Sequence, residues 1–83
     1  MEDRIRDILG RCGRLSIPAH DVAADDNLYD AGLSSLATVS VMLAIEEEFD
    51  VEFPDSLLTR RSFESVAALA GVVTRLKSGV LIS

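Results

Sequence analysis

Apolar residues recur at spacings of three and four in three separate segments of the chain, and this periodicity limits the fold more than any other feature of the sequence. Such spacings place side chains along one stripe of a helix, whereas a half-buried strand requires alternation of apolar and polar residues. No segment shows that alternation. The first periodic segment spans about residues 2–15, and its stripe comprises Ile5, Ile8, Leu9, Cys12 and Leu15. The pattern predicts an all-α fold in which Cys12 belongs to the core.

The second segment predicts a helix over about residues 35–50, and it holds more apolar residues than a one-sided helix needs. Its main apolar face is expected to comprise Leu36, Val39, Leu43 and Phe49, widened by Met42 and Ile45. Val41 and Ala44 add apolar side chains elsewhere on the helix. A helix that is apolar around so much of its circumference either lies centrally or offers apolar surface to a partner. Ser34 precedes the helix as a suitable N-cap.

The third segment predicts a last helix over about residues 63–77, with Ser62 as its N-cap and Glu64 in its first turn. Its buried stripe is expected to comprise Phe63, Val66, Ala67, Ala70, Val73 and Leu76. Gly79 marks the predicted end of this helix. The short tail, residues 78–83, is given no assignment.

A long connection, residues 17–34, joins the first two predicted helices. We expect Leu28 and Leu33 to anchor it to the core, because so long an unanchored loop is unusual in a small domain. Gly32, just before the second helix, suits a position that needs unusual backbone angles.

A short helix is predicted over about residues 55–60, with Leu57 and Leu58 facing inward. The whole chain, residues 1–83, is then one domain with one core. The predicted fold is a small bundle of three main helices plus one short helix.

The net charge of the chain is −6, and the acidic residues gather in its middle. Residues 21–56 hold ten of the 14 Asp and Glu residues and no Lys or Arg. A negative block of this kind repels the phosphates of nucleic acid and attracts partners that have basic surfaces. Direct nucleic-acid binding is therefore not expected. The block is interpreted either as a partner-binding surface or as a plain solvated face.

The chain also lacks the usual signals for membranes and secretion. Its N-terminus enters an amphipathic pattern directly, so no signal peptide is predicted. No apolar run approaches the roughly 20 residues that a membrane span needs. Cys12 is the only cysteine, so no disulfide within the chain is predicted. These features favour a cytoplasmic protein.

The sequence does not contain the residue sets that common catalytic and metal sites require. His20 is the only histidine, so there is no histidine pair for a metal and no predicted base for a serine nucleophile. Residues 25–32 look briefly like a calcium loop, but Tyr29 or Leu28 falls on a position that requires an oxygen ligand. The protein is therefore predicted not to be an enzyme, and a small serine hydrolase is the weakest alternative.

Two serines, Ser34 and Ser35, mark the predicted start of the second helix. A helix N-terminus offers free N–H groups and a positive dipole end, which suit a covalently attached phosphate. Serines at this position more often serve only as caps. From the residues alone both interpretations stay open, and the capping role is favoured.

Residues 30–36 (DAGLSSL) and 44–55 (AIEEEFDVEFPD) together resemble the acyl carrier protein family. In that family a Gly-x-Asp-Ser-Leu segment opens the second helix, and an acidic, Phe-containing end closes it ahead of a proline. The resemblance implies that Ser35 receives 4′-phosphopantetheine from coenzyme A through a phosphopantetheinyl transferase. It further implies that the thiol of this arm holds an acyl or aminoacyl cargo as a thioester. The implied partners are a cargo-loading ligase and downstream acyl-transfer enzymes, and the carrier is expected to be a monomer.

The sequence departs from the family pattern at the attachment segment itself. Ser34 stands where the family usually has Asp. This departure affects the recognition of this chain by transferases that contact that acidic side chain. Alignment on Leu36 and on the acidic block at 46–48 assigns the modified serine as Ser35 rather than Ser34.

Ala37 and Ser40 stand where fatty-acid carriers often have acids, and with Val41 and Met42 they make this face more apolar than is typical. The departure favours a specialised carrier, either a stand-alone carrier of amino acids charged by a free-standing ligase or a polyketide-type carrier. The expected partner-contact residues are Ser34, Leu36, Ala37, Ser40, Val41, Met42, Glu46 and Glu47. The main alternative is an unmodified helical interaction module, and modification of Ser35 separates the two.

Overall fold

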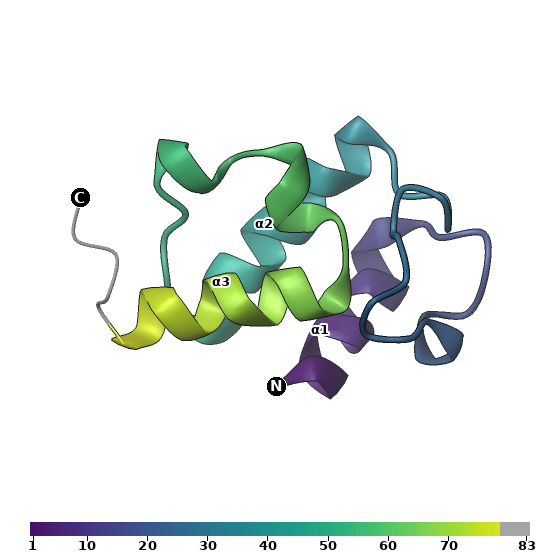
Figure 1. Ribbon diagram of the computed structural model, residues 1–83, viewed down its shortest axis with the longest axis horizontal. Helices are drawn as coiled ribbons and strands as arrows, with labels where there is room; N and C mark the ends of the chain where they lie inside the picture. The colour runs from purple at the N-terminus through teal and green to yellow at the C-terminus, as the bar shows by residue number, and fades with distance from the viewer. Residues whose placement is uncertain (79–83) are drawn as a thin grey trace.

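The computed structural model describes residues 1–78 and contains three α-helices, α1 (Glu2–Ile8), α2 (Ser35–Phe49) and α3 (Val66–Ser78). α3 crosses in front of α2, and the connection between α1 and α2 forms one end of the molecule (Figure 1). Single turns of 3-10 helix occur at Ala19–Asp21, Asp55–Leu57 and Arg60–Phe63. No strand occurs in residues 1–78. The predicted all-α fold is confirmed.

The first helix is longer than α1 alone, because a π-helical turn at Leu9–Gly13 continues it. The helix ends where Arg14 adopts left-handed backbone angles (φ 51°), slightly before the predicted end at residue 15. Ile5, Ile8 and Leu9 are fully buried as expected. Cys12 and Leu15 are half-buried and pack against the core. The position of Cys12 agrees with a role in packing.

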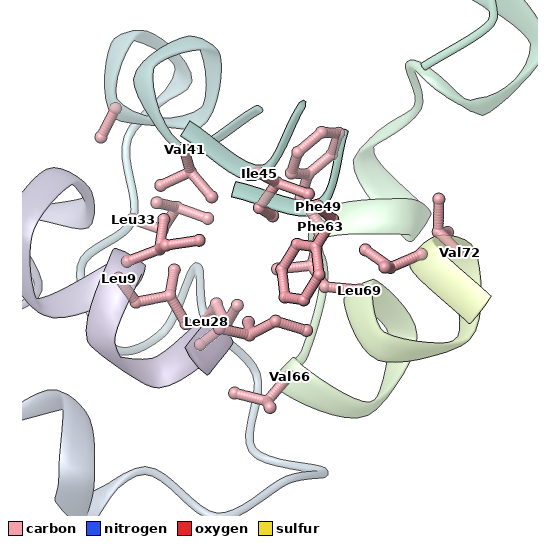
Figure 2. Close-up of a cluster of buried hydrophobic side chains, with 14 of the residues drawn as sticks. Leu9, Leu28, Leu33, Val41, Ile45, Phe49, Phe63, Val66, Leu69 and Val72 are labelled. Carbon is pink, nitrogen blue, oxygen red and sulfur yellow. The ribbon is translucent and has the colours of Figure 1, made fainter. Parts of the chain in front are cut away.

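The core is mainly aliphatic and also contains the buried rings of Phe49, Phe53 and Phe63. Figure 2 shows part of this cluster. Its largest fully buried side chains are those of Ile5, Ile8, Leu9, Leu28, Ile45 and Leu69. The rings of Phe53 and Phe63 stack with centroids 5.4 Å apart. This stack attaches the segment after α2 to the turn before α3, and both rings are buried.

The buried face of α2 differs from the predicted one. Its buried residues lie at a spacing of four: Ala37, Val41, Ile45 and Phe49. Leu36, Val39 and Leu43 are instead 84%, 52% and 55% exposed. Both faces of α2 are apolar, so periodicity alone could not decide which one packs against the π-helical turn and α1. Of the four residues of the expected main face, only Phe49 is buried. Ile45, which was expected to widen that face, is buried as well.

The segment between α2 and α3 also differs from prediction. It contains two 3-10 turns rather than one short helix, Asp55–Leu57 and Arg60–Phe63. The second turn begins at Thr59, whose hydroxyl accepts a hydrogen bond from the Ser62 N–H at 3.3 Å. Leu57 is half-buried, but Leu58 is 45% exposed and does not face inward.

α3 begins at Val66, later than predicted, because the 3-10 turn uses residues 60–63. Ser65, not Ser62, supplies the cap: its hydroxyl accepts a hydrogen bond from the Ala68 N–H at 3.0 Å. The buried stripe shifts with the start of the helix. It comprises Val66, Leu69, Val72 and Val73, whereas Ala67 is exposed. Gly79 and the tail lie outside the described residues, except for Ser78, which ends α3.

The far end of α3 is tied to the far end of α2. The Lys77 ammonium donates a hydrogen bond to the carbonyl of Phe49 at 3.1 Å, which places a positive charge at the negative end of the α2 dipole. α2 stops there because Asp50 adopts left-handed backbone angles (φ 56°). None of the helices in the described part of the chain is long and apolar enough to span a membrane.

Candidate functional site

The loop before α2 is held firmly, and it sets where that helix begins. Asn27 Oδ1 accepts hydrogen bonds from the N–H groups of Tyr29 and Asp30 at 2.9 and 3.1 Å. The N–H of Leu28 donates to the carbonyl of Glu64 at 2.7 Å, and its side chain is fully buried. Leu33 is buried as well, so both predicted anchors are confirmed.

Gly32 is required at the last bend before α2. Its φ is +111°, in a region that favours glycine. The preceding carbonyl of Ala31 accepts hydrogen bonds from both the N–H and the hydroxyl of Ser16, at 2.7 and 2.8 Å. Ser16 therefore lies so close that a Cβ on Gly32 would come within 2.9 Å of its backbone nitrogen.

We expect Gly32→Ala to lower the free energy of unfolding by about 2 kcal/mol or more, because strained backbone angles and a backbone contact act together. The matched control is Gly71→Ala in α3, where an added Cβ meets nothing within 4 Å. That change should stabilise the protein by up to about 1 kcal/mol through helix propensity. Urea unfolding of both variants measures the difference. Equal effects of the two substitutions would contradict this account of Gly32.

The two serines at the start of α2 have different roles. Ser34 has extended backbone angles, and its hydroxyl accepts a hydrogen bond from the Ala37 N–H at 3.1 Å, so it is the N-cap as predicted. Ser35 is the first residue of the helix and is exposed. Its hydroxyl makes no hydrogen bond with any residue of the described part of the chain. Of the two serine hydroxyls, only that of Ser35 therefore lies outside the hydrogen bonds that cap α2.

A groove of about 350 Å³ borders Ser35. One wall is α2, and the other is the segment that holds the 3-10 turns before α3, with Tyr29 also in the lining. Its lining residues are Tyr29, Ser35, Thr38, Val39, Met42, Leu58, Thr59, Arg60 and Phe63. The lining thus combines apolar side chains with hydroxyl groups and one guanidinium. An elongated ligand with both methyl and amide groups fits such a surface.

Tyr29 and Arg60 both line this groove and contact each other. The Arg60 guanidinium lies 3.8 Å from the centroid of the Tyr29 ring, and the Tyr29 hydroxyl donates to the Arg60 carbonyl at 3.0 Å. Burial raises the pKa of Tyr29 above its usual value, and the positive charge of Arg60 only partly opposes that rise. Tyr29 therefore stays neutral and keeps its donor proton at physiological pH. From the sequence, Tyr29 was considered only as a poor calcium ligand and Arg60 was missed, because the two residues are 31 positions apart.

The predicted partner-contact residues do not all lie on the surface. Ala37 and Val41 are buried against the core, so the expectation that they contact a partner is wrong. Met42 and Glu46 are half-buried. The exposed members are Ser34, Leu36, Ser40 and Glu47, and Leu43 joins them at helical spacing.

The acidic end of α2 is partly used within the fold. Glu46 Oε2 accepts a hydrogen bond from the Phe53 N–H at 2.8 Å, which organises the chain after the helix. Glu48 forms an ion pair with Arg4 at 3.3 Å. Glu47 is exposed. The charge available to a partner is thus smaller than the run of three glutamates indicates. Elsewhere, residues 1–78 contain no group of three or more His, Cys, Asp or Glu side chains that could hold a metal ion.

An exposed serine at a helix N-terminus, beside a mixed groove in an all-α bundle, is the arrangement expected of a phosphopantetheine carrier. The family model for the phosphopantetheine attachment site matches residues 3–73, so the chain belongs to this family. The predicted carrier class is confirmed.

Several known carrier proteins are similar to this chain. The chain is 48% identical to an aminoacyl carrier protein of Agrobacterium fabrum, over 95% of each chain. The chain also resembles a chain in a crystal structure of an engineered Bradyrhizobium japonicum glycine:[carrier protein] ligase bound to AMP and to the carrier protein from Agrobacterium tumefaciens. The two chains superpose with a TM-score of 0.86 and are 50% identical, and the match covers 89% of this chain and 99% of that one.

A glycine:[carrier protein] ligase of Bradyrhizobium japonicum is also known in complex with a glycylated carrier protein. The present chain superposes on that structure with a TM-score of 0.74 and 34% identity, covering 86% of this chain and 95% of that one.

Proposed function

We propose that this protein carries an aminoacyl group as a thioester on a 4′-phosphopantetheine arm joined to Ser35. The observation that carries the proposal is the exposed Ser35 hydroxyl at the start of a 15-residue helix, hydrogen-bonded to no described residue, in a chain 48% identical to an aminoacyl carrier protein. The positive end of the helix dipole suits a phosphate on Ser35. The groove beside it suits the methyl and amide groups of pantetheine.

In this proposal the residues around Ser35 prepare it for a transferase. Ser34 Oγ accepts one N–H of the first turn and leaves the Ser35 hydroxyl outside the capping network. Oγ of Ser35 forms a bond to the phosphorus next to pantetheine in coenzyme A, and the P–O bond of the pyrophosphate breaks. Adenosine 3′,5′-bisphosphate leaves, and the serine proton passes to the enzyme or solvent. The arm then supplies a thiol for thioester formation.

We propose an ATP-dependent amino acid:[carrier protein] ligase as the loading partner, because the superposed carriers are found with a glycine:[carrier protein] ligase. The docking face is the exposed stripe of α2, comprising Leu36, Ser40, Leu43 and Glu47. Leu36 is 84% exposed beside the attachment residue, which suits contact with an apolar patch on a partner. Docking there would give the tethered thiol a high effective concentration at the active site of the ligase.

The test begins with the purified protein, coenzyme A, magnesium and a broad-specificity phosphopantetheinyl transferase, followed by intact-mass analysis. We expect a gain equal to one phosphopantetheine. No gain with a transferase that modifies another carrier in parallel would count against the arm. Failure with the transferases of the source cell as well would leave the unmodified interaction module as the better account.

The cargo is tested on the modified protein. With a glycine:[carrier protein] ligase, ATP and glycine, we expect a second mass gain equal to one glycyl group, removed by hydroxylamine as a thioester is. An acyl-carrier synthetase with a long-chain fatty acid is the comparison. Efficient fatty-acyl loading without aminoacyl loading would reject the proposed cargo. The cytoplasmic location and the monomeric state stay predictions.

A further inference from the structure

One positive charge lies in the groove beside Ser35. Of the described residues that line the groove, Arg60 is the only charged one. Arg4, Arg6 and Arg11 form ion pairs with carboxylates, whereas Arg60 forms none with a described residue. Such a guanidinium is notable in a chain of net charge −6, because carboxylates are plentiful.

The fold holds this guanidinium in place. Its central carbon, Cζ, lies over the Tyr29 ring, 3.8 Å from the ring centroid, and the hydroxyl of the same tyrosine donates to the Arg60 carbonyl at 3.0 Å. Backbone and head group are therefore both held by Tyr29. Tyr29 belongs to the loop whose hydrogen bonds to Asn27 and whose neighbour Leu28 set the start of α2. The same loop thus positions both Ser35 and Arg60.

The chemistry of this side chain matches one ligand class. A guanidinium that packs over a ring keeps its N–H groups, and their fork geometry can bind phosphate oxygens in pairs. Ser35 and Arg60 border the same groove. A phosphodiester on Ser35 would bring a negative charge to a groove in which, among the described residues, a guanidinium is the only charged group.

We propose that Arg60 binds the phosphodiester of the arm and so directs the arm into the groove between α2 and the turns at 55–63. The inference rests on the proposed attachment at Ser35 and goes beyond it. Arg60 acts here as a positioning residue. Beyond it, the arm meets a lining of apolar and hydroxyl side chains: Thr38, Val39, Met42, Leu58, Thr59 and Phe63.

The direct test follows the side-chain Nε–H signals of the arginines by NMR, before and after attachment of the arm. We expect exchange of the Arg60 Hε with water to slow by about tenfold or more in the modified protein, because a charge-assisted bond to phosphate protects the proton. Arg61 provides the control within the same sample, since it borders a different hollow, with Ala68 and Gly71 of α3. Unchanged Arg60 exchange in a protein whose mass shows the arm attached would overturn the proposal.

A matched pair of variants gives a second readout. Backbone amide shifts caused by attachment are expected at Val39, Met42 and Thr59 in the wild type and in Arg61→Gln. In Arg60→Gln they should shrink to Ser35 and its sequence neighbours. Arg60→Lys, which keeps the charge but loses the fork, should restore the groove shifts only in part. Equal shifts in Arg60→Gln and the wild type would contradict a role for Arg60.

These measurements separate the two proposals. Absence of any mass gain rejects attachment itself and, with it, the role of Arg60, which requires the phosphodiester. A mass gain that is lost in Ser35→Ala, with no change at Arg60, retains the carrier function and rejects only the role of Arg60.

Discussion

Ser35→Ala is expected to abolish the phosphopantetheine mass gain completely, whereas Ser34→Ala is expected to retain it. The reason is that the two hydroxyls have different structural roles. The Ser34 hydroxyl accepts the Ala37 N–H and caps α2, while the Ser35 hydroxyl is exposed and has no hydrogen bond to a described residue. Intact mass after treatment with a transferase and coenzyme A measures the outcome.

The folded state of both variants is checked by circular dichroism and urea unfolding. Loss of the cap in Ser34→Ala should lower the free energy of unfolding by about 1 kcal/mol, so the variant stays folded and remains a fair substrate. Ser35→Ala should leave stability almost unchanged, because alanine is a good helix former. The opposite pattern, with modification lost only in Ser34→Ala, would reassign the attachment residue.

The second large effect concerns the two apolar faces of α2. Ile45→Ala is expected to lower the free energy of unfolding by about 2–5 kcal/mol, because it removes buried methyl groups and leaves a cavity. Ile45 is fully buried in the core cluster, where Figure 2 shows it with Val41 and Phe49 of the same helix. In a domain of this size such a loss is a large part of the total stability.

Leu43→Ala is the control for this prediction, because it removes a side chain of the same composition from the other face of the same helix. Leu43 is 55% exposed, so its replacement should change the free energy of unfolding by no more than about 0.5 kcal/mol. Urea unfolding monitored by circular dichroism compares the two. A larger loss for Leu43→Ala than for Ile45→Ala would mean that the face expected from the sequence was the buried one.

Much of the fold was predictable from neighbouring residues. The 3.6-residue pattern of the first segment identified the buried Ile5, Ile8 and Leu9. Ser34 was identified as a cap and Gly32 as a residue with unusual backbone angles, and both are confirmed. Each of these features depends on interactions within a few residues of chain, so a single sequence contains enough information to predict it.

The errors have a common origin. Ser62 has the residue type of a cap and precedes an apolar stripe, but a 3-10 turn that Thr59 starts takes residues 60–63 out of the helix. The stack of Phe63 on Phe53 and the hydrogen bond from Leu28 to Glu64 attach that turn to distant parts of the chain. Ser65 then becomes the cap of α3. Sequence windows contain none of these long-range contacts.

The region around Ser35 shows the same contrast between local interactions and long-range contacts. The sequence alone determined that three main helices form, where α2 begins, and that two serines stand at that start, because capping and periodicity are local. Only the tertiary structure decided which face of α2 is buried, that Ala37 and Val41 are unavailable to a partner, and that Arg60 meets Tyr29 beside Ser35. Those outcomes depend on packing between segments far apart in the chain, where the burial of one apolar face against α1 outweighs the alternative face that the pattern of α2 equally allows.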